Sequence, residues 1–284
     1  MKPTIINIGG VPEHFNQPWH EALAKGLFSQ KNIDLHWTDY PGGTGAMNKD
    51  LRSGILDAAV ILTEGIVADI AQGNETKIVQ WYVKSPLVWG IHTGAHSPVQ
   101  NDSSFAGKKY AISRYGSGSH LMAFVDAHQR GLTIRQDQFV VVNNLDGAVK
   151  ALSSGEADLF MWEKFMTKPL VDQGIFRRVG ECPTPWPSFV IAVRTKFLEE
   201  NPEAIQAMLS VIREACKEFY AQPDAAEKLS AKFNLQLADV QEWMKAIRWQ
   251  TEASFDPQPL KEVINTLVDL KIIEKQISVR ELCK

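Results

Sequence analysis

The segment 113–120, SRYGSGSH, concentrates residues that can act on a small molecule or hold one. It contains three serines, two glycines, one arginine and one histidine within eight positions. This composition allows a serine nucleophile with a histidine base, a phosphate-binding loop, or a loop that only cradles a ligand. The spacing of the residues favours one of these chemistries over the others.

Three well-known loop patterns do not match this segment. A nucleophile elbow requires G-x-S-x-G, and the glycines and serines here are out of that register. A P-loop requires a lysine after its glycines, and none follows. Leu121 occupies the third glycine position of the dinucleotide pattern. No acidic partner is placed for a Ser/His pair, so we expect no catalytic residue in this segment.

A ligand cradle agrees better with the elements expected on either side of the segment. A short strand over 110–113 precedes it, and a helix is predicted to begin near Ser119 or His120. The free N–H groups of a helix's first turn favour a negatively charged ligand. The glycines allow close approach, the serines add hydroxyl donors, and Arg114 adds a charge-assisted bond. A capped helix without a ligand is the alternative. The candidate ligand-binding residues are Ser113, Arg114, Gly116, Ser117, Gly118, Ser119 and His120.

The N-terminal part of the chain alternates strands with helices. Strands are predicted over 5–8, 33–40 and 58–62, and helical periodicity is found over 19–27 and 46–52. Such alternation is typical of an α/β domain with a largely parallel sheet.

Two segments of the chain resemble each other. Residues 51–73 and 152–174 align without a gap, and each reads as helix end, Ser-Gly turn, strand, helix and glycine stop. We interpret them as equivalent parts of two similar lobes, although shared Ser-Gly turns alone are the alternative. The identical pairs are Leu51/Leu152, Ser53/Ser154, Gly54/Gly155, Asp57/Asp158, Gln72/Gln173 and Gly73/Gly174.

The order of the elements predicts a chain that leaves one lobe and later returns to it. Lobe one is expected over 1–90, completed by 191–284, whose later part is helical. Lobe two is expected over 91–190, and the polar segment 101–108 reads as a link. Each lobe is predicted to hold a mixed, mainly parallel sheet flanked by helices. Two crossings between lobes suit hinge closure around a ligand.

Further candidate ligand-binding residues lie in loops at the carboxyl ends of predicted strands, where open α/β sheets bind ligands. Phe15, Trp162 and Trp186 are expected to cover an apolar part of the ligand, and Glu64 or Glu163 to select a donor group. Lobe one contributes Gly10, Glu13, His14, Phe15, Asn16, Gly43, Thr44, Thr63 and Glu64; lobe two adds Trp162 and Glu163, and Trp186 precedes the return crossing.

Composition excludes several classes of function. A formal net charge of −3 gives no basic excess for nucleic acid, and no apolar run is long enough to span a bilayer. The three cysteines form no CxxC pair, and the histidines have no clear third ligand, so no metal and no cofactor are expected. No signal-peptide pattern opens the chain, which leaves cytoplasmic and periplasmic locations both open.

The ordered set of motifs resembles the type II periplasmic solute-binding proteins. The motifs are 54–57 before a strand, 107–112 leading into 116–120, and 155–158 followed by Trp162-Glu163. The nearest branch is that of nitrate, sulfonate and taurine ABC transporters with the related thiamine-pyrimidine-precursor binding proteins, and the likeness covers about residues 4–200. The fungal pyrimidine-forming branch carries a cysteine-rich motif that is absent here.

This resemblance implies a periplasmic-binding-protein-like type II fold, with a ligand cleft between two lobes that close on binding. It also implies a monomer, with an ABC permease as a partner. We therefore expect a non-catalytic protein that binds a small organic, anionic molecule, either sulfonate- or nitrate-like or pyrimidine-like. The alternative is a cytoplasmic enzyme of pyrimidine-precursor metabolism that uses His14 or His120 with Glu64. A sensor that docks on a partner is a third interpretation.

Overall fold

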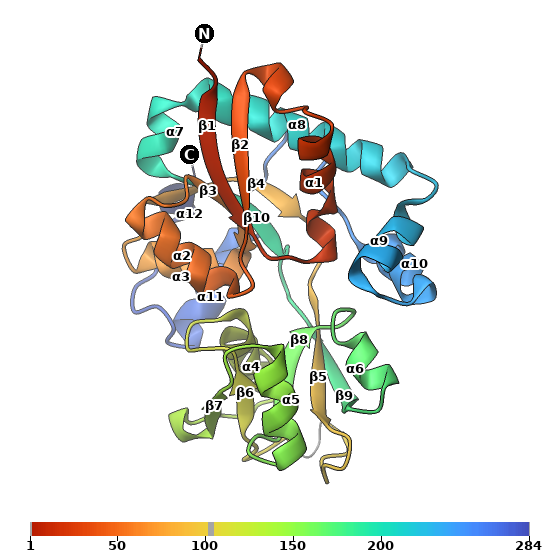
Figure 1. Cartoon of the computed structure of the whole chain (residues 1–284). Coiled ribbons are helices and arrows are strands. Elements are labelled where there is room, and N and C mark those ends of the chain that lie inside the picture. The colour runs from red at the N-terminus through yellow and green to blue at the C-terminus, as the bar shows by residue number, and fades with distance from the viewer. Residues whose placement is uncertain (1, 102–104, 284) are drawn as a thin grey trace. The chain divides into compact units, whose positions relative to one another are not determined.

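The computed structural model describes residues 2–101 and 105–283, so part of the expected link over 101–108 lies outside the described residues. The chain divides into two compact units (Figure 1). Unit 1 contains Met1–Ser85 and Trp186–Lys284, and unit 2 contains Pro86–Pro185. The chain therefore leaves unit 1 once and returns to it, and unit 1 is assembled from both ends of the sequence.

Unit 1 is built on a five-stranded sheet of order β2-β1-β3-β10-β4. Strand β1 runs parallel to β2 and β3, whereas β10 runs antiparallel to both β3 and β4. The sheet is therefore mixed, with one reversed strand that follows the return crossing. The strands are β1 Thr4–Gly10, β2 Ile33–Asp39, β3 Ala58–Leu62, β4 Thr76–Val83 and β10 Phe189–Arg194.

Unit 2 repeats this arrangement in a five-stranded sheet of order β7-β6-β8-β5-β9. Strand β6 runs parallel to β7 and β8, and the reversed strand β5 pairs antiparallel with β8 and β9. As in unit 1, the reversed strand comes directly after the chain has passed from one unit to the other. The strands are β5 Val88–Gly94, β6 Tyr110–Ile112, β7 Phe139–Val141, β8 Leu159–Glu163 and β9 Phe176–Pro183.

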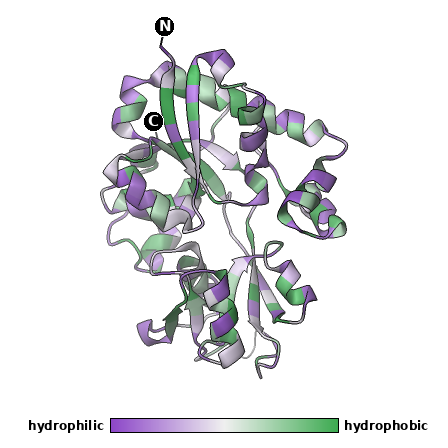
Figure 2. Ribbon diagram, in the orientation of Figure 1, coloured by the Kyte–Doolittle hydropathy of each residue, from purple (hydrophilic) through white to green (hydrophobic). Residues whose placement is uncertain are grey.

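Helices flank both sheets, and they interleave hydrophobic with hydrophilic residues as packing on a sheet requires (Figure 2). Within the described ranges, no helix is both long and apolar enough to cross a bilayer. Unit 1 has α1 Gln17–Ala24, α2 Gly43–Ser53, α3 Thr63–Ala71, α7 Thr195–Glu200, α8 Pro202–Ala221, α9 Ala225–Phe233, α10 Leu237–Ala246, α11 Leu260–Asp269, α12 Val279–Leu282 and the short 3-10 turns η1 His14–Asn16 and η2 Ser29–Lys31. Unit 2 has α4 Gly118–Gln129, α5 Leu145–Ser154, α6 Lys168–Asp172 and η4 Gln136–Gln138.

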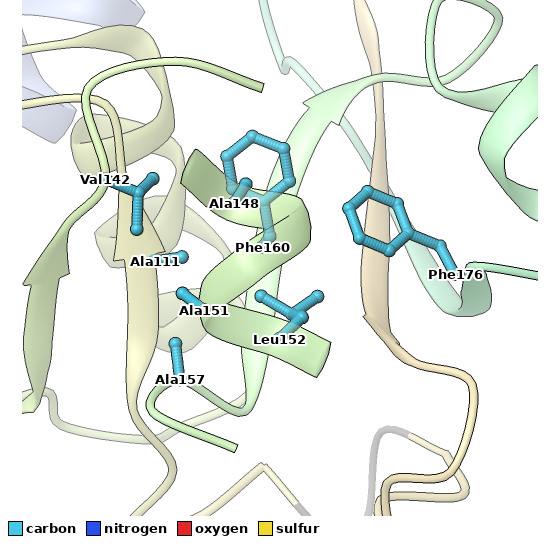
Figure 3. Close-up of a cluster of buried hydrophobic side chains, with 8 residues drawn as sticks. All are labelled: Ala111, Val142, Ala148, Ala151, Leu152, Ala157, Phe160 and Phe176. Carbon is cyan, nitrogen blue, oxygen red and sulfur yellow. The ribbon is translucent and has the colours of Figure 1, made fainter. Parts of the chain in front are cut away.

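The core of unit 2 includes a compact hydrophobic cluster between α5 and the sheet (Figure 3). Small alanine side chains on α5 allow the helix to approach the strands closely, and Phe160 and Phe176 fill the remaining space with their rings 6.3 Å apart. The members of the cluster are Ala111, Val142, Ala148, Ala151, Leu152, Ala157, Phe160 and Phe176. This packing holds the carboxyl ends of β6 and β8 in place beside each other.

The internal repeat is confirmed by equivalent backbone and side-chain roles. Helices α2 and α5 both end at a glycine in the left-handed region, Gly54 with φ 78° and Gly155 with φ 75°. Asp57 accepts a hydrogen bond from the backbone N–H of Asn7 at 2.9 Å, and Asp158 accepts one from that of Lys109 at 2.9 Å. In each unit this aspartate therefore links the start of one parallel strand to its neighbour, to the middle of β1 in unit 1 and to the residue just before β6 in unit 2.

We predict that the Asp57 carboxylate stabilises unit 1. Asp57 is buried and also accepts from the Asn7 side chain at 3.0 Å and from Arg194 at 3.1 Å. Asp57→Ala should lower the free energy of unfolding by about 2–3 kcal/mol, because it leaves the Asn7 N–H without a partner. Chemical denaturation measures the change. Asp34→Ala, at an exposed aspartate, is the control, and an equal effect of both changes would contradict the proposed role.

Candidate functional site

The loops that follow parallel strands carry most of the predicted ligand-binding residues. In unit 2 these loops follow β6 and β8, and in unit 1 they follow β1, β2 and β3. Because neighbouring parallel strands end at the same edge of a sheet, each unit gathers its loops at one edge. The two clusters are described separately below.

In unit 2 the serine hydroxyls shape the turn that opens helix α4. The helix begins at Gly118 with Ser117 as its N-cap, close to the predicted start at Ser119 or His120. Ser117 Oγ accepts from the His120 N–H at 3.4 Å, and Ser119 Oγ accepts from the Ser113 N–H at 3.0 Å. The Ser117 and Ser119 oxygens lie 3.0 Å apart. The serines therefore hold the loop in shape, in addition to any contact with a ligand.

His120 presents one unpartnered donor in this loop. Its Nδ1 accepts a hydrogen bond from the N–H of Gly116 at 3.0 Å, so the ring proton of a neutral imidazole is on Nε2. That Nε2 is buried and has no hydrogen-bond partner among the described residues. Burial lowers the pKa of His120 to about 4, so the ring is neutral at pH 7. Gly116 makes the contact from the left-handed region, with φ 74°.

Arg114 adds a positive charge to the same loop. Its side chain is half-buried, and its Nη2 atom is buried without a hydrogen-bond partner in the part of the chain that the structure describes. Desolvation lowers the pKa of the guanidinium, but an arginine remains charged at neutral pH. A buried donor without an acceptor lowers the stability of the fold unless a ligand or a water molecule accepts its hydrogen bond. The loop therefore offers two free donors, Arg114 Nη2 and His120 Nε2.

The two residues predicted at the end of β8 have other contacts. Glu163 is buried, and its Oε2 accepts from the backbone N–H groups of Phe165 at 2.8 Å and Met166 at 2.7 Å. The carboxylate therefore shapes its own loop. Trp162 lies nearly parallel to Phe160, with ring centroids 5.4 Å apart.

In unit 1, Glu64 is the polar residue with the most unusual environment. It is fully buried in the first turn of α3, and its Oε2 accepts from the indole N–H of Trp186 at 2.9 Å. Its Oε1 is buried with no partner among the described residues. Burial raises the pKa of Glu64 to about 7. Neighbouring Thr63 donates to the carbonyl of Pro187 at 2.6 Å, so this contact and the Trp186–Glu64 bond join α3 to the segment before β10.

The loop after β1 places His14 in an apolar environment. The His14 ring is buried against Trp243, at 4.1 Å between centroids, and neither ring nitrogen has a partner among the described residues. Burial lowers its pKa to about 3. Because of this low pKa, His14 is neutral and suited to packing or to a neutral hydrogen bond. Glu13, in contrast, is half-buried by surface area, and desolvation raises its pKa to about 7.

Phe15 and Asn16 complete this loop. The Phe15 ring packs on Phe189 at 4.1 Å, and its carbonyl accepts from Tyr82 at 2.7 Å and Trp249 at 2.9 Å. Asn16 occupies the N-cap position of α1, but its side chain makes no cap bond. Its Nδ2 instead donates to the carbonyl of Val11 at 2.8 Å, while its Oδ1 is buried without a partner among the described residues.

Small residues allow these loops to lie close together. A Cβ atom at Gly10 would lie 2.5 Å from the Trp37 ring, and one at Gly65 would lie 2.3 Å from the Thr44 methyl group. Gly43 begins α2 with φ 64°. The structure therefore explains Gly10 and Gly43 by packing and backbone conformation, and it brings Thr44 against the turn that holds Glu64.

One polar residue at this edge, Asn48, was missed by the sequence analysis. Asn48 lies on α2 and is buried; its Nδ2 donates to the Gly65 carbonyl at 3.2 Å, and its Oδ1 has no partner among the described residues. Nothing in the spacing of residues 43–53 distinguishes it from an ordinary polar helix residue. Among the residues described above, unit 1 thus has free acceptor atoms on Glu64, Asn48 and Asn16 as well as the two free ring nitrogens of His14, and unit 2 has free donors on Arg114 and His120. No group of three or more His, Cys, Asp or Glu in the described ranges is placed to hold a metal ion.

Two α/β units with mixed five-stranded sheets, joined by two crossings, define a periplasmic-binding-protein-like type II protein, as the resemblance predicted. Residues 89–182 match the family model described as "Ca3427-like PBP". The *Candida albicans* CA3427 gene product, whose structure is described as defining a new family with the generic periplasmic-binding-protein fold, is 28% identical. That match covers 99% of this chain and 96% of that one, with a TM-score of 0.92.

Sulfonate-binding proteins are also among the similar proteins. The alkanesulfonate-binding protein SsuA from *Xanthomonas axonopodis* pv. citri, solved with bound MOPS, is 16% identical, with a TM-score of 0.81, and the match covers 100% of this chain and 99% of that one. A *Bacillus subtilis* (strain 168) protein whose name gives aliphatic sulfonates as its proposed ligand is 24% identical over 190 residues. That match covers 66% of this chain but only 56% of the relative's length. The family resemblance is therefore confirmed.

We predict that Glu64 makes the stability of the protein depend on pH. Its pKa is about 7 in the folded chain and about 4.3 when unfolded, so the folded state holds the extra proton. The contribution of Glu64 to the free energy of unfolding is complete below its pKa in the unfolded chain. This contribution is lost as the pH rises to the pKa of Glu64 in the folded chain. The free energy of unfolding of Glu64→Gln, measured relative to the wild type, should therefore rise by up to about 3 kcal/mol between pH 5 and pH 8.

Denaturation curves of both proteins across this pH range measure the difference. Glu200→Gln, at an exposed glutamate, is the control because it removes the same charge without burial. A constant difference between wild type and Glu64→Gln from pH 5 to pH 8 would contradict an elevated pKa at Glu64.

Proposed function

We propose that this protein binds a small organic molecule that carries both an anionic group and a hydrogen-bond donor. The chain has the solute-binding fold, and its relatives include proteins named for sulfonates and nitrate. The observation that carries the proposal is a set of three buried polar atoms without partners among the described residues, on Arg114, His120 and Glu64. Unit 2 offers donors from Arg114 and His120, and unit 1 offers an acceptor from Glu64.

The anionic group would bind to the loop before α4. Arg114 supplies a full positive charge, His120 a neutral N–H donor, and the first turn of α4 adds the positive end of a helix dipole. A sulfonate, phosphate or carboxylate oxygen matches this donor set. No acidic side chain occurs between Ser113 and His120 to oppose the anion.

The donor group of the ligand would bind to Glu64. The Glu64 Oε1 atom is a buried acceptor without a partner among the described residues, while Trp186 holds Oε2 in place. An amine or a ring N–H would satisfy Oε1 and would favour the ionised carboxylate, because a nearby positive charge lowers the pKa of an acid. Aminoalkyl sulfonates and aminopyrimidines with an anionic substituent have this pair of groups. A ligand that reaches both units would favour their closure, and an ABC permease is the partner that such a carrier implies.

An equilibrium-binding screen tests this proposal. The panel contains aminoalkyl sulfonates, alkyl sulfonates without the amine, nitrate, and aminopyrimidines with and without a phosphate. Isothermal titration of the purified protein should detect tightest binding for a compound that has both groups, and the compound should be recovered unchanged. Equal affinity for a compound lacking the amine would remove Glu64 from the site, and recovery of a converted product would instead support the enzymatic alternative.

We predict that Arg114→Gln weakens the best ligand of that screen by about 1.5–3 kcal/mol, which is about tenfold to a hundredfold in Kd. The reason is the loss of a partly desolvated, charge-assisted bond. Titration calorimetry measures the change. Arg135→Gln, at an exposed arginine of the same unit, is the matched control. Equal affinity of Arg114→Gln and Arg135→Gln would exclude Arg114 from ligand binding.

A further inference from the structure

An open cavity lies in unit 1, lined by residues that the proposed function does not use. Its volume is about 630 Å³, with three basic side chains and two aromatic rings in its wall. None of its residues is among the candidate ligand-binding residues described above. The cavity is lined by Lys84, Lys217, Tyr220, Arg248, Trp249 and Thr251.

The backbone of the chain fixes two of the three cations in place. Val83 forms an antiparallel bridge with Trp249, and the Lys84 N–H donates to the Arg248 carbonyl at 2.6 Å. The Arg248 N–H in turn donates to Ser85 Oγ at 3.1 Å. Residues far apart in sequence are thus held side by side through main-chain contacts, which do not depend on the charged ends of Lys84 and Arg248.

The positive charge of the cavity is only partly neutralised. No acidic side chain of the described residues lines the cavity. Lys217 pairs with Glu214 at 2.8 Å, one helical turn away on α8. Arg248 Nη1 donates to the carbonyls of Lys245 and Ile247 but pairs with no carboxylate among the described residues, and Lys84 likewise has no ion pair there.

Two aromatic side chains, Tyr220 and Trp249, line the cavity, and their polar atoms already form hydrogen bonds within the protein. Tyr220 and Trp249 pack edge to face at 4.8 Å. The Tyr220 hydroxyl donates to the Ile247 carbonyl at 2.6 Å, and the Trp249 indole N–H donates to the Phe15 carbonyl at 2.9 Å. These two polar groups are therefore already used within the protein, and the charged hydrogen-bond donors of the cavity are Lys84, Lys217 and Arg248.

We infer that this cavity binds a small molecule through a phosphate or diphosphate group. A group with two or more negative charges can be contacted by several cations at once, and the arginine fork suits phosphate oxygens. Lysines act as point charges beside it. The aromatic side chains that line the cavity would contact a flat or apolar remainder of the ligand. This site is separate from the proposed ligand site and goes beyond the proposed function.

Titration calorimetry with pyrophosphate at low ionic strength tests the inference. Lys84→Gln and Arg248→Gln should each weaken binding about fivefold or more, and the double variant should abolish it, because these exposed charges provide the attraction. Lys261→Gln removes an exposed lysine of α11 and should leave the affinity unchanged. Added salt should weaken binding in the wild type.

The same titration in an Arg114→Gln background separates this site from the first one. Pyrophosphate binding that is unchanged in Arg114→Gln, weakened in Lys84→Gln and in Arg248→Gln, and lost in their double variant supports the second site, whatever the fate of the proposed function. Loss of binding in Arg114→Gln alone would assign the anion to the first site and overturn the inference. Absence of saturable binding in the wild type, or equal affinity in all variants, would overturn it as well. Thermal unfolding of each variant tests whether it is folded. If Arg248→Gln does not fold, the comparison of wild type with Lys84→Gln alone decides whether the cavity binds pyrophosphate.

Discussion

Parallel pairing of strands is the constraint on which the candidate site depends. In unit 1 β1 pairs in parallel with β2 and β3, and in unit 2 β6 pairs in parallel with β7 and β8, so their carboxyl ends share an edge. Arg114 and Glu64 both lie two residues beyond the end of such a strand. Asp57 and Asp158, each just before a parallel strand, bond to backbone N–H groups of the neighbouring strand or the residue that precedes it. The position of each candidate group therefore follows from the pairing of the strand that it succeeds.

Desolvation gives these groups their chemical character. Burial raises the pKa of Glu64 and lowers those of His14, His120 and Arg114, so each group is held at a cost in free energy. A ligand with complementary groups would offset part of that cost, because it would bond to atoms that otherwise lack partners.

Much of the fold could be predicted from local patterns. The strand 58–62 was predicted with its observed bounds, and the repeat of 51–73 in 152–174 anticipated the matching glycines that end α2 and α5. The N-terminal turn of α4 was also predicted, because a Gly-Ser turn before an apolar helical face is a local signal. Patterns of this kind operate over a few residues, which is why they can be read from sequence.

The remaining features depend on contacts between distant residues. Glu64 and Trp186 are bonded across 122 positions, and Lys84 meets Arg248 through a bridge between two extended segments. Glu163 was predicted to select a ligand group, yet its carboxylate accepts two backbone bonds from its own loop, and sequence type alone does not distinguish these roles. Asn48 carries no sequence signal, because its burial arises from the packing of α2 against the turn at Gly65.

The proposed function requires one ligand to contact both units. Hydrogen exchange followed by mass spectrometry, with and without the best ligand of the binding screen, tests this requirement. We predict increased protection of 113–120 in unit 2 together with 63–66 in unit 1, with both effects saturating at the same ligand concentration. Protection confined to one of these segments, or saturation at two different concentrations, would contradict the proposed function.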